Sequence, residues 1–376
     1  MKVHVQAPGR VNIIGEHTDY NQGFVLPMAV SMGISLTAES RSDKLVKVYS
    51  RNLDQEASFS LSGLIPADSH NWWDYPAGVC WALRKAGYKF SGANIVFGGD
   101  LPIGAGLSSS AALEVAVAAA LSHLSSLKIP FRELALIAQR AENEYVGVQC
   151  GIMDQFASAL SMEGYGIFID CRSLEYEHVP LNLGEHAFVI IDSRVKRNLA
   201  DSAYNHRRAE CAEALAVINR AAGKQSKSLR EISLDDLEKA RPVMLPELYN
   251  RGYFVVRENQ RVLAAVQAFQ RGDLQACGSL MNQSHEGLRR LFEVSCKEVD
   301  LIVDAAQAFR GVLGARMTGA GFGGCVIVLV RRERIKKLQE RILEKTQASA
   351  SRAPHFYVTK PAAGLKVTGL PSAERP

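Results

Sequence analysis

The alternation of hydrophobic and polar positions predicts both strands and helices in the first half of the chain. Residues 2–6 alternate as a strand does, and the Pro8-Gly9 pair should then end the strand and open a loop. Residues 108–124 are almost uncharged and mostly small or aliphatic, which is typical of a helix packed on most of its circumference. A second helix should begin at a proline and cover 130–146.

A change in pattern divides the chain near its middle. A strand is expected over 164–170, and apolar density then falls in the polar, turn-rich stretch 172–186. We place a domain boundary there, which gives an N-terminal domain over 1–178 and a C-terminal domain over 179–376. The second half should be rich in helices, with a strand over 187–192, helices over 200–222, 257–271, 273–292 and 297–309, and a buried strand over 325–330.

Composition and charge exclude several classes of protein. With 47% hydrophobic and 22% charged residues, the chain has the composition of an ordinary folded protein, and its formal charge of +5 does not indicate a nucleic-acid partner. The longest mostly apolar run, 107–121, is too short to cross a bilayer, which needs about 20 apolar residues. We expect no membrane span, no secretory signal and, as the simplest state, a monomer, although oligomers stay open.

The cysteines indicate the compartment. There are seven of them, widely scattered and without a Cys-x-x-Cys pair, so neither a zinc site nor a disulfide framework is predicted. A reducing cytoplasm fits this usage best.

A glycine-rich loop directly precedes the predicted buried helix. It has the sequence LPIGAGLSSSAA over 101–112. The first N–H groups of a helix have no partner inside it, and the helix dipole adds partial positive charge, so this end is suited to phosphate. The three consecutive hydroxyls exceed what a helix cap needs and could supply phosphate donors and a magnesium ligand. The structural alternative is a serine-capped buried helix. The loop is not a Walker loop, because no Gly-Lys-Ser/Thr follows.

A second glycine-rich loop, GAGFGG over 319–324, satisfies the pattern Gly-x-Gly-x-x-Gly. It leads into a strand, whereas a dinucleotide-binding fingerprint must open a helix. Val326 extends the match to the glycine-rich loop of protein kinases, but the other motifs of that family are absent from the sequence. A tight turn is the structural alternative.

Polar residues are concentrated in GRVNIIGEHTDY over 9–20. A metal site at Glu16, His17 and Asp19 lacks the second histidine at helical spacing that such sites usually have. Sugar hydroxyls fit better, because each hydroxyl both donates and accepts and can be recognised by acids with a nearby histidine. An ion-paired loop is the structural alternative.

Two further acids are candidates for chemistry. At about 100° per residue, Glu142 falls beside the apolar face of the helix over 130–146, whereas Glu144 points away from it. A carboxylate that turns inward needs a cation or hydrogen-bond donors, so magnesium and a buried arginine are the two alternatives. Asp154 precedes an apolar helical run, and its position by itself favours a helix N-cap.

Four blocks together resemble the GHMP small-molecule kinases. They are 8–20, 101–112, 150–155 and 318–324, spread over nearly the whole chain. Mevalonate and homoserine kinases resemble the second and fourth blocks, whereas Gly-Glu-His-Thr-Asp-Tyr in the first resembles the galactose signature of the family. The resemblance implies a two-domain α+β fold. Its N-terminal domain would be like the second domain of a small-subunit ribosomal protein, its C-terminal domain would be ferredoxin-like, and the active site would lie in the cleft between them.

The resemblance also implies an activity and its residues. The chain would transfer the γ-phosphoryl group of ATP to the C1 hydroxyl of galactose and would require Mg²⁺. Asp154 would face the anomeric hydroxyl, with Arg10 as its catalytic partner. The sugar site would contain Glu16, His17, Asp19, Gly151 and Tyr204, the nucleotide site Trp72, Gly104, Gly106, Leu107, Ser108, Ser109, Ser110 and Ala111, and the metal site Ser110 and Glu142.

Several alternatives stay open within that resemblance. Trp73 competes with Trp72 for the adenine. The family includes non-catalytic sugar sensors with a shortened serine-alanine stretch, but the stretch 108–112 is complete here. The residues around C2 and C6 of the sugar cannot be identified from the sequence, so N-acetylgalactosamine, arabinose and galacturonate are alternative substrates. Galactose and ATP are the expected partners, with no nucleic acid and no membrane.

Overall fold

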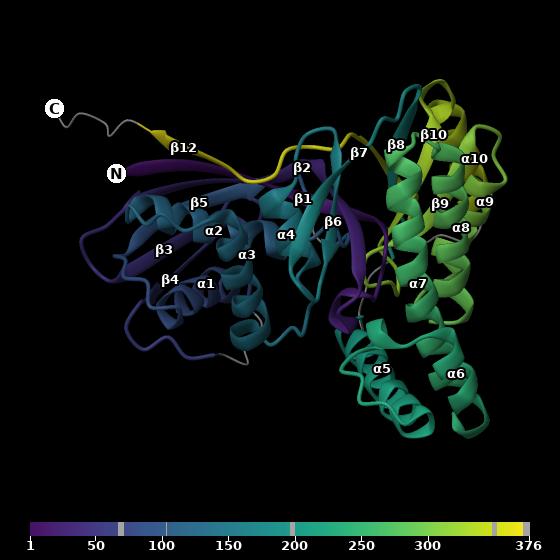
Figure 1. Cartoon of the computed structure of the whole chain (residues 1–376). Helices are drawn as coiled ribbons and strands as arrows, with labels where there is room; N and C mark the ends of the chain where they lie inside the picture. The colour runs from purple at the N-terminus through teal and green to yellow at the C-terminus, as the bar shows by residue number, and fades with distance from the viewer. Residues whose placement is uncertain (67–70, 103, 196–199, 348–351, 371–376) are drawn as a thin grey trace.

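The N-terminal part of the chain builds a large sheet (Figure 1). The computed structural model describes residues 1–66, 71–102, 104–195, 200–347 and 352–370. The sheet has eight strands in the order β12-β1-β2-β5-β3-β4, and β6 pairs with both β2 and β7. Its strands are β1 (Lys2–Ile14), β2 (Phe24–Ser40), β3 (Leu45–Ser50), β4 (Gln55–Ser60), β5 (Ala93–Gly99), β6 (Tyr165–Asp170), β7 (Glu175–Pro180) and β12 (Lys366–Leu370).

The first strand continues through Pro8 and Gly9, so the predicted loop at this pair is wrong. β1 pairs with β2 along its length, with a register irregularity between Pro8 and Arg10 that accommodates the proline. A Cβ atom on Gly9 would lie 2.4 Å from Leu101 Cδ2 and 2.6 Å from the Leu107 oxygen. The glycine is therefore needed for close approach of the loop 101–107, and Arg10 projects from a strand.

Four helices pack on this sheet: α1 (Asp74–Lys85), α2 (Ser109–Leu124), α3 (Phe131–Arg140) and α4 (Met153–Leu160). The helix predicted over 108–124 is confirmed as α2, which packs against β1 and β2 and is surrounded by the other three helices. Its alanine-rich sequence allows this close approach, and every residue from Ala111 to Ser122 is buried. The helix predicted over 130–146 is α3 followed by a π-helical turn, Ala141–Val146.

The second sheet is antiparallel, in the order β11-β8-β10-β9. It consists of β8 (His186–Asp192), β9 (Val312–Thr318), β10 (Cys325–Arg331) and β11 (His355–Thr359). The helices of this half are α5 (Ala200–Ala222), α6 (Leu234–Ala240), α7 (Pro246–Gln270), α8 (Leu274–Arg290), α9 (Lys297–Gln307) and α10 (Ile335–Thr346). The predicted strands and helices of this half are confirmed, except that α7 begins at Pro246 instead of 257. The strands β9 and β11 and the helix α6 were not predicted.

The second sheet lies between two hydrophobic cores. Along β10, Ile327 and Leu329 join the core of the first sheet, while Val326 and Val328 join the core of the C-terminal helices. Burial on both faces explains why this strand is an uninterrupted apolar run in the sequence. The same burial attaches the two parts of the molecule firmly to one another.

The chain passes from the first sheet to the second between β7 and β8. The stretch 172–186, predicted to be turn-rich, has turns at 171–174 and 184–185, but between them it also contains β7, an edge strand of which only Val179 is fully buried. Its polar composition therefore reflects an exposed edge strand as well as turns. β12 returns to the first sheet and pairs with β1, so the segment 366–370 completes the N-terminal part. The division into 1–178 and 179–376 stays a prediction.

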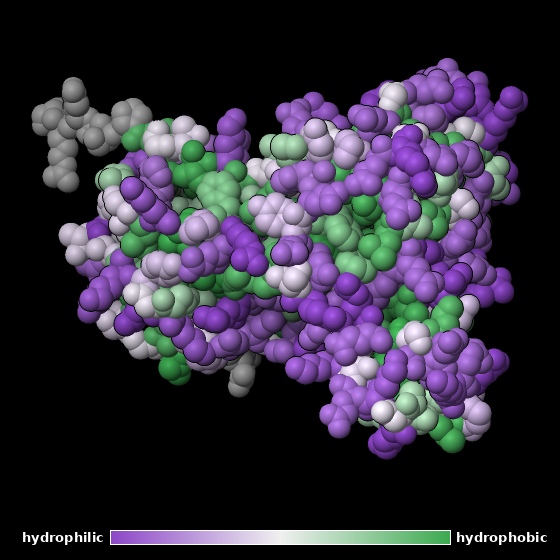
Figure 2. Space-filling view, in the orientation of Figure 1, coloured by the Kyte–Doolittle hydropathy of each residue, from purple (hydrophilic) through white to green (hydrophobic). Residues whose placement is uncertain are grey.

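The surface is mainly polar. Figure 2 shows hydrophilic residues over most of one face of the molecule, with smaller apolar areas between them. Within the described residues, each helix is too short or too polar to cross a membrane.

Candidate active site

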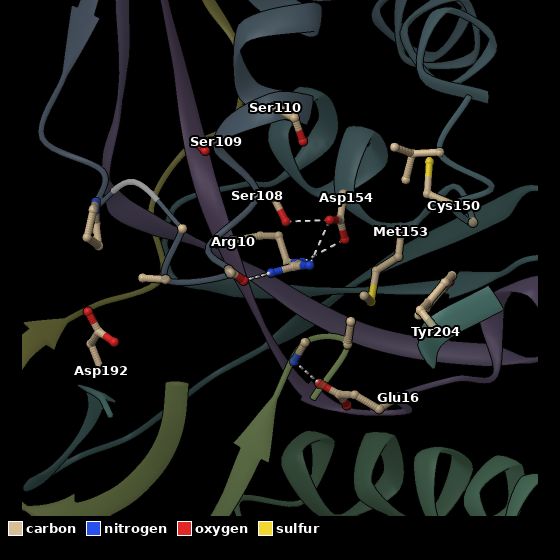
Figure 3. Close-up of a pocket in the computed structure, with 18 of the residues that line it drawn as sticks. Arg10, Glu16, Ser108, Ser109, Ser110, Cys150, Met153, Asp154, Asp192 and Tyr204 are labelled. Carbon is tan, nitrogen blue, oxygen red and sulfur yellow. Dashed lines mark hydrogen bonds and ion pairs between the residues drawn. The ribbon is translucent and has the colours of Figure 1, made fainter. Parts of the chain in front are cut away.

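A cleft of about 860 Å³ opens where the polar segment 9–20, the loop 101–112 and the loop 318–324 meet. Residues from both sheets and from α4 and α5 line it, so segments that are far apart in the sequence share one cavity (Figure 3). The predicted residues that line it are Arg10, Glu16, His17, Asp19, Gly104, Gly106, Ser108, Ser109, Ser110, Glu142, Gly151, Asp154 and Tyr204.

Arg10 and Asp154 form a bidentate ion pair at the centre of the cleft. Arg10 Nε donates to Asp154 Oδ1 and Nη2 to Oδ2, both at 2.7 Å, while Nη1 donates to the Gly106 oxygen at 2.8 Å. The N-cap of α4 is Ile152, so Asp154 lies in the first turn and is not the cap that its sequence position favoured. Two parallel charge-assisted bonds fix the carboxylate in one orientation, with its side chain 26% exposed toward the cleft.

Ser108 leaves the amino end of α2 open. It is the N-cap residue but makes no capping hydrogen bond, because its hydroxyl donates to Asp154 Oδ2 instead. Gly104, Gly106 and Ser108 all have left-handed backbone conformations, with φ of 77°, 80° and 61°. The alternative of a serine-capped helix is therefore wrong for Ser108. The first amides of a helix have no partner within the helix and are suited to an anion. The glycines before this helix allow a ligand to approach them closely.

A group of buried acids lies beside this helix end. Ser110 Oγ donates to Glu142 Oε1 at 3.1 Å, and Gln155 Nε2 donates to Glu142 Oε2 at 2.6 Å. Burial raises the pKa of Glu142, and the nearby charge of Asp154 raises it further. Glu114, which the sequence analysis missed, is fully buried, and its Oε1 accepts no hydrogen bond from the described residues. Such a concentration of oxygen ligands and negative charge fits a divalent cation.

No three His, Cys, Asp or Glu side chains in the described part of the chain form a metal-binding group by themselves. Ser110 Oγ and Glu142 Oε1, which lie 3.1 Å apart, are two oxygen atoms that could bind one cation together. This small set matches Mg²⁺, which proteins commonly hold through one or two side chains together with substrate phosphates and water.

Glu16 links the polar segment to the second sheet. Its Oε1 accepts from the Gly319 amide at 2.8 Å, and its Oε2 accepts from Asn12 Nδ2 at 2.7 Å and pairs with Arg316 Nη2 at 2.6 Å. Burial raises the pKa of Glu16, and the ion pair with Arg316 opposes that rise. Sequence analysis missed Arg316, although an arginine inside the otherwise apolar strand β9 is a recognisable signal of a buried ion pair.

His17 is neutral, and both of its ring nitrogens have hydrogen-bond partners. Nδ1 lies 2.9 Å from the Tyr20 hydroxyl and Nε2 3.2 Å from the Ala320 oxygen. Burial lowers the pKa of His17 to about 3. The ring also packs against Tyr204, with ring centroids 5.6 Å apart, so α5 supplies this wall of the cleft.

Asp19 lies directly against the backbone of Gly151. A Cβ atom at Gly151 would come 1.9 Å from Asp19 Oδ2, so only glycine fits beside the carboxylate in this arrangement. Burial raises the pKa of Asp19 to about 6, and the charge of Asp154 contributes to the rise.

Three predicted nucleotide residues do not line the cleft with the others. Trp72 donates from Nε1 to Gln55 Oε1 at 2.9 Å and packs edge-on against Trp73; of that segment, Tyr75 is the residue that reaches the cavity. Leu107 and Ala111 are buried, and the Leu107 oxygen accepts from the Arg10 amide at 3.1 Å. Leu107 and Ala111 therefore contribute to the shape of the loop.

Part of the cleft lining was not predicted from the sequence. These residues are Asp192, Arg194, Arg352 and Tyr357. Arg194 and Arg352 lie in irregular segments, where no periodic pattern identifies a functional side chain.

Known proteins match the chain over most of its length. Residues 2–39 match the galactokinase galactose-binding signature, 74–162 the N-terminal domain of the GHMP kinases, and 265–347 the C-terminal domain. The galactokinase of Thermotoga petrophila is 46% identical over 340 residues, which are 90% of this chain and 93% of the relative. The galactokinase of Haemophilus influenzae is 40% identical, with 97% of this chain and 95% of the relative covered.

Comparison with solved structures supports the same family. The structure of Lactococcus lactis galactokinase complexed with galactose has a TM-score of 0.93 and 37% identity, covering 97% of this chain and 95% of that one. A mevalonate kinase structure, at 19% identity and a TM-score of 0.66, shares the fold. The two-domain α+β architecture implied by the sequence is thereby confirmed.

Proposed function

The chain belongs to the GHMP kinases and, within that family, to the galactokinases, and from this membership we propose how its cleft divides between sugar and nucleotide. Its activity is the ATP-dependent phosphorylation of galactose at the C1 hydroxyl, which gives α-galactose 1-phosphate. One observation supports the assignment of residues: Asp154 pairs with Arg10 and accepts a hydrogen bond from Ser108 at the amino end of α2.

The sugar occupies the side of the pair that faces the segment 16–19 and α5. Figure 3 supports this division, because Tyr204 and Glu16 lie on one side of Asp154 and Ser109 and Ser110 on the other. Asp19 and Tyr204 offer a carboxylate and a hydroxyl to sugar hydroxyl groups. Glu16 and His17, whose polar atoms already have protein partners, hold the segment in place as well as facing the cleft.

ATP occupies the other side, with its phosphates over the loop 101–112. The open amides of α2 and the hydroxyls of Ser109 and Ser110 are donors there. Arg194 and Arg352, which also line the cleft, supply positive charge. This charge matters because Arg10 is already paired with Asp154, and acidic side chains otherwise dominate the cleft.

Ser110 and Glu142 would hold Mg²⁺ at the boundary of the two sites. Bound there, the ion would neutralise negative charge on the phosphates. Glu142 is the side chain that needs a cation, because it is buried beside Glu114 and Asp154 without an arginine or lysine partner among the described residues.

Asp154 is placed to accept the proton of the C1 hydroxyl. As the sugar oxygen bonds to the γ-phosphorus, the bond from that phosphorus to the β–γ bridging oxygen breaks and ADP leaves. Arg10 and Ser108 hold the carboxylate in position. A carboxylate is an adequate base, because phosphoryl transfer passes mainly through a loose transition state in which positioning matters most.

A coupled ADP-release assay tests the assignment. Galactose should stimulate ADP release, and the product should carry its phosphate on O1, as phosphorus and proton spectra would show. Parallel assays with N-acetylgalactosamine, arabinose and galacturonate define specificity. Binding of galactose and ATP without ADP release would instead indicate a sugar sensor.

We also propose a monomer in a reducing, cytoplasmic setting. No disulfide bond joins cysteines within the described residues, which fits such a compartment. Light scattering on the purified protein measures the molar mass directly, and a mass well above 41.1 kDa would reject the monomer.

A further inference from the structure

The segment that carries the sugar-site residues is held at both ends by one helix. β1 ends at Ile14 and β2 begins at Phe24, and the connection between them carries Glu16, His17 and Asp19. We propose that Glu258 and Asn259, adjacent residues of α7, are positioning residues that set the shape of this connection and thereby the affinity for galactose. The proposal rests on the sugar site proposed above.

Glu258 holds the first end of the connection. Its carboxylate is fully buried, and Oε1 accepts from the Gly15 amide at 3.0 Å. The carboxylate is itself fixed, because Ser284 of α8 donates to Oε1 at 2.5 Å and Arg261 Nε donates to Oε2 at 2.7 Å. The hydrogen bond to Gly15 therefore comes from a side chain with little freedom to move.

Gly15 fits this contact in two ways. Its φ of 102° lies in the region that favours glycine, and a Cβ atom there would come 2.8 Å from Val262 Cγ2. Helix α7 thus packs directly on the backbone where the connection begins.

Asn259 holds the other end. Its Oδ1 accepts from the Phe24 amide at 2.8 Å, while its Nδ2 donates to the Val255 oxygen one turn earlier in α7. The side-chain amide is 6% exposed, and both of its polar atoms are used. A Cβ atom at Gly23 would come 2.3 Å from Asn259 Oδ1, so the glycine keeps space for this contact.

Internal hydrogen bonds connect the two ends. Thr18 Oγ1 donates to the Phe24 oxygen at 2.6 Å and lies 2.9 Å from the Gly15 oxygen, while the Gly23 amide donates to the Thr18 oxygen at 2.7 Å. A shift at either end is therefore transmitted to the residues beside Thr18. Asp19 is one of them, and its carboxylate occupies the space where a Cβ atom at Gly151 would lie.

The contacts of Glu258 and Asn259 should affect the binding of galactose and not the binding of ATP. Glu258 and Asn259 hydrogen bond to the connection between β1 and β2, and the described hydrogen bonds of both side chains do not involve the loop 101–112. Loss of the contact should weaken galactose binding and leave ATP binding unchanged. A contact that only stabilised the fold would not distinguish the two substrates.

The test compares Asn259→Ala with the parent and with Gln260→Ala, an exposed neighbour on the same helix. We expect Asn259→Ala to raise the KM and the Kd for galactose roughly tenfold, the effect of one lost positioning hydrogen bond, with the KM for ATP within about twofold of the parent. Asn259→Asp keeps an acceptor for the Phe24 amide and should recover part of the galactose affinity. Gln260→Ala should match the parent.

Calorimetric titration of galactose in the absence of ATP, together with melting temperatures, makes the outcomes distinct. Unchanged galactose affinity in Asn259→Ala, or equal rises in the KM for both substrates, would overturn the inference. If Asn259→Ala does not fold, Asn259→Ser replaces it, because the shorter side chain stays polar but cannot reach the Phe24 amide in the same way. A parent protein that does not release ADP with galactose would overturn the proposed function instead.

Discussion

Ser108 directs its hydroxyl to Asp154 and not to the amides at the start of α2. One hydrogen bond thus serves two sites: it orients the carboxylate that Arg10 holds from the other side, and it leaves the helix end open to phosphate. The left-handed backbone of Ser108, with φ of 61°, places the side chain for this purpose. The proposed base and the phosphate cradle are therefore parts of one hydrogen-bonded unit.

Replacement of the proposed base should remove turnover but not nucleotide binding. Asp154→Asn keeps the shape of the side chain and loses the ability to accept the proton, so kcat should fall by about 10² to 10⁴. The Kd for ATP should stay within about twofold, because the phosphates contact the other side of the cleft. Steady-state kinetics and calorimetry check the two parts. Turnover within tenfold of the parent would reject Asp154 as the base.

The metal assignment predicts a different loss. Ser110→Ala removes one of two oxygen ligands, so the Mg²⁺ concentration for half-maximal activity should rise severalfold while the Kd for galactose stays constant. Binding of Mn²⁺ in the presence of ADP, followed by electron paramagnetic resonance, gives a readout that does not depend on turnover. The conservative variant Ser110→Thr, which keeps the hydroxyl, serves as the control. An unchanged metal dependence in Ser110→Ala would remove this residue from the site.

Much of this site could be predicted because its residues occur in short, distinctive blocks. The phosphate loop was recognised from the position of its glycines and serines before a buried helix, and Glu142 from its place beside an apolar face. That arithmetic assumed a regular helix, whereas Glu142 lies in a π-helical turn, yet Glu142 is buried and Glu144 exposed as expected.

The rest depends on contacts between distant parts of the chain. Arg316 pairs with Glu16, which lies 300 positions earlier in the chain. Glu114 is a single acid in an otherwise apolar helix, and its sequence position does not indicate that Gln155 and Glu142 lie beside it. Pro8-Gly9 was misread for a related reason, since the glycine makes room for a distant loop and not for a turn. Local patterns carry no information about such neighbours.

The contact between Gly151 and Asp19 can be tested with a double-mutant cycle. Gly151→Ala should displace the Asp19 carboxylate and raise the KM for galactose roughly tenfold, because a Cβ atom cannot be accommodated 1.9 Å from Oδ2. In an Asp19→Ala background the same substitution should add little, since its target is absent. Additive effects of the two substitutions would show that Gly151 acts in some other way.

The raised pKa of Asp19 predicts a dependence on pH. The pKa of Asp19 is about 6 in the folded protein against an ordinary value of 3.8 for an aspartate, so the folded state binds more protons than the unfolded state between these values. The contribution of Asp19 to the free energy of unfolding is therefore greatest at low pH and decreases as pH rises through 4 to 6. Asp19→Asn should remove this decrease. Melting temperatures of parent and variant between pH 4 and 7 test it, and parallel curves would contradict the assignment.

The unpredicted arginines give a prediction for the nucleotide side. Arg194 and Arg352 line the cleft and, unlike Arg10, have no carboxylate partner among the described residues. Their charge offsets part of the repulsion between the acidic cleft and a polyanionic nucleotide. Arg194→Ala and Arg352→Ala should each raise the KM for ATP about threefold to tenfold, more at low than at high salt, and leave the KM for galactose unchanged.

Arg341→Ala is the matched control for these two arginine variants, because this arginine lies on α10, where it pairs with Glu344 and does not line the cleft. Loss of the same positive charge there should leave both KM values at the parent level. Equal effects of all three substitutions would mean that the total charge of the protein, and not the two cleft arginines, controls nucleotide binding. Arg194→Lys should keep most of the ATP affinity if charge alone is required, since the ammonium group carries the charge without the fork of the guanidinium group.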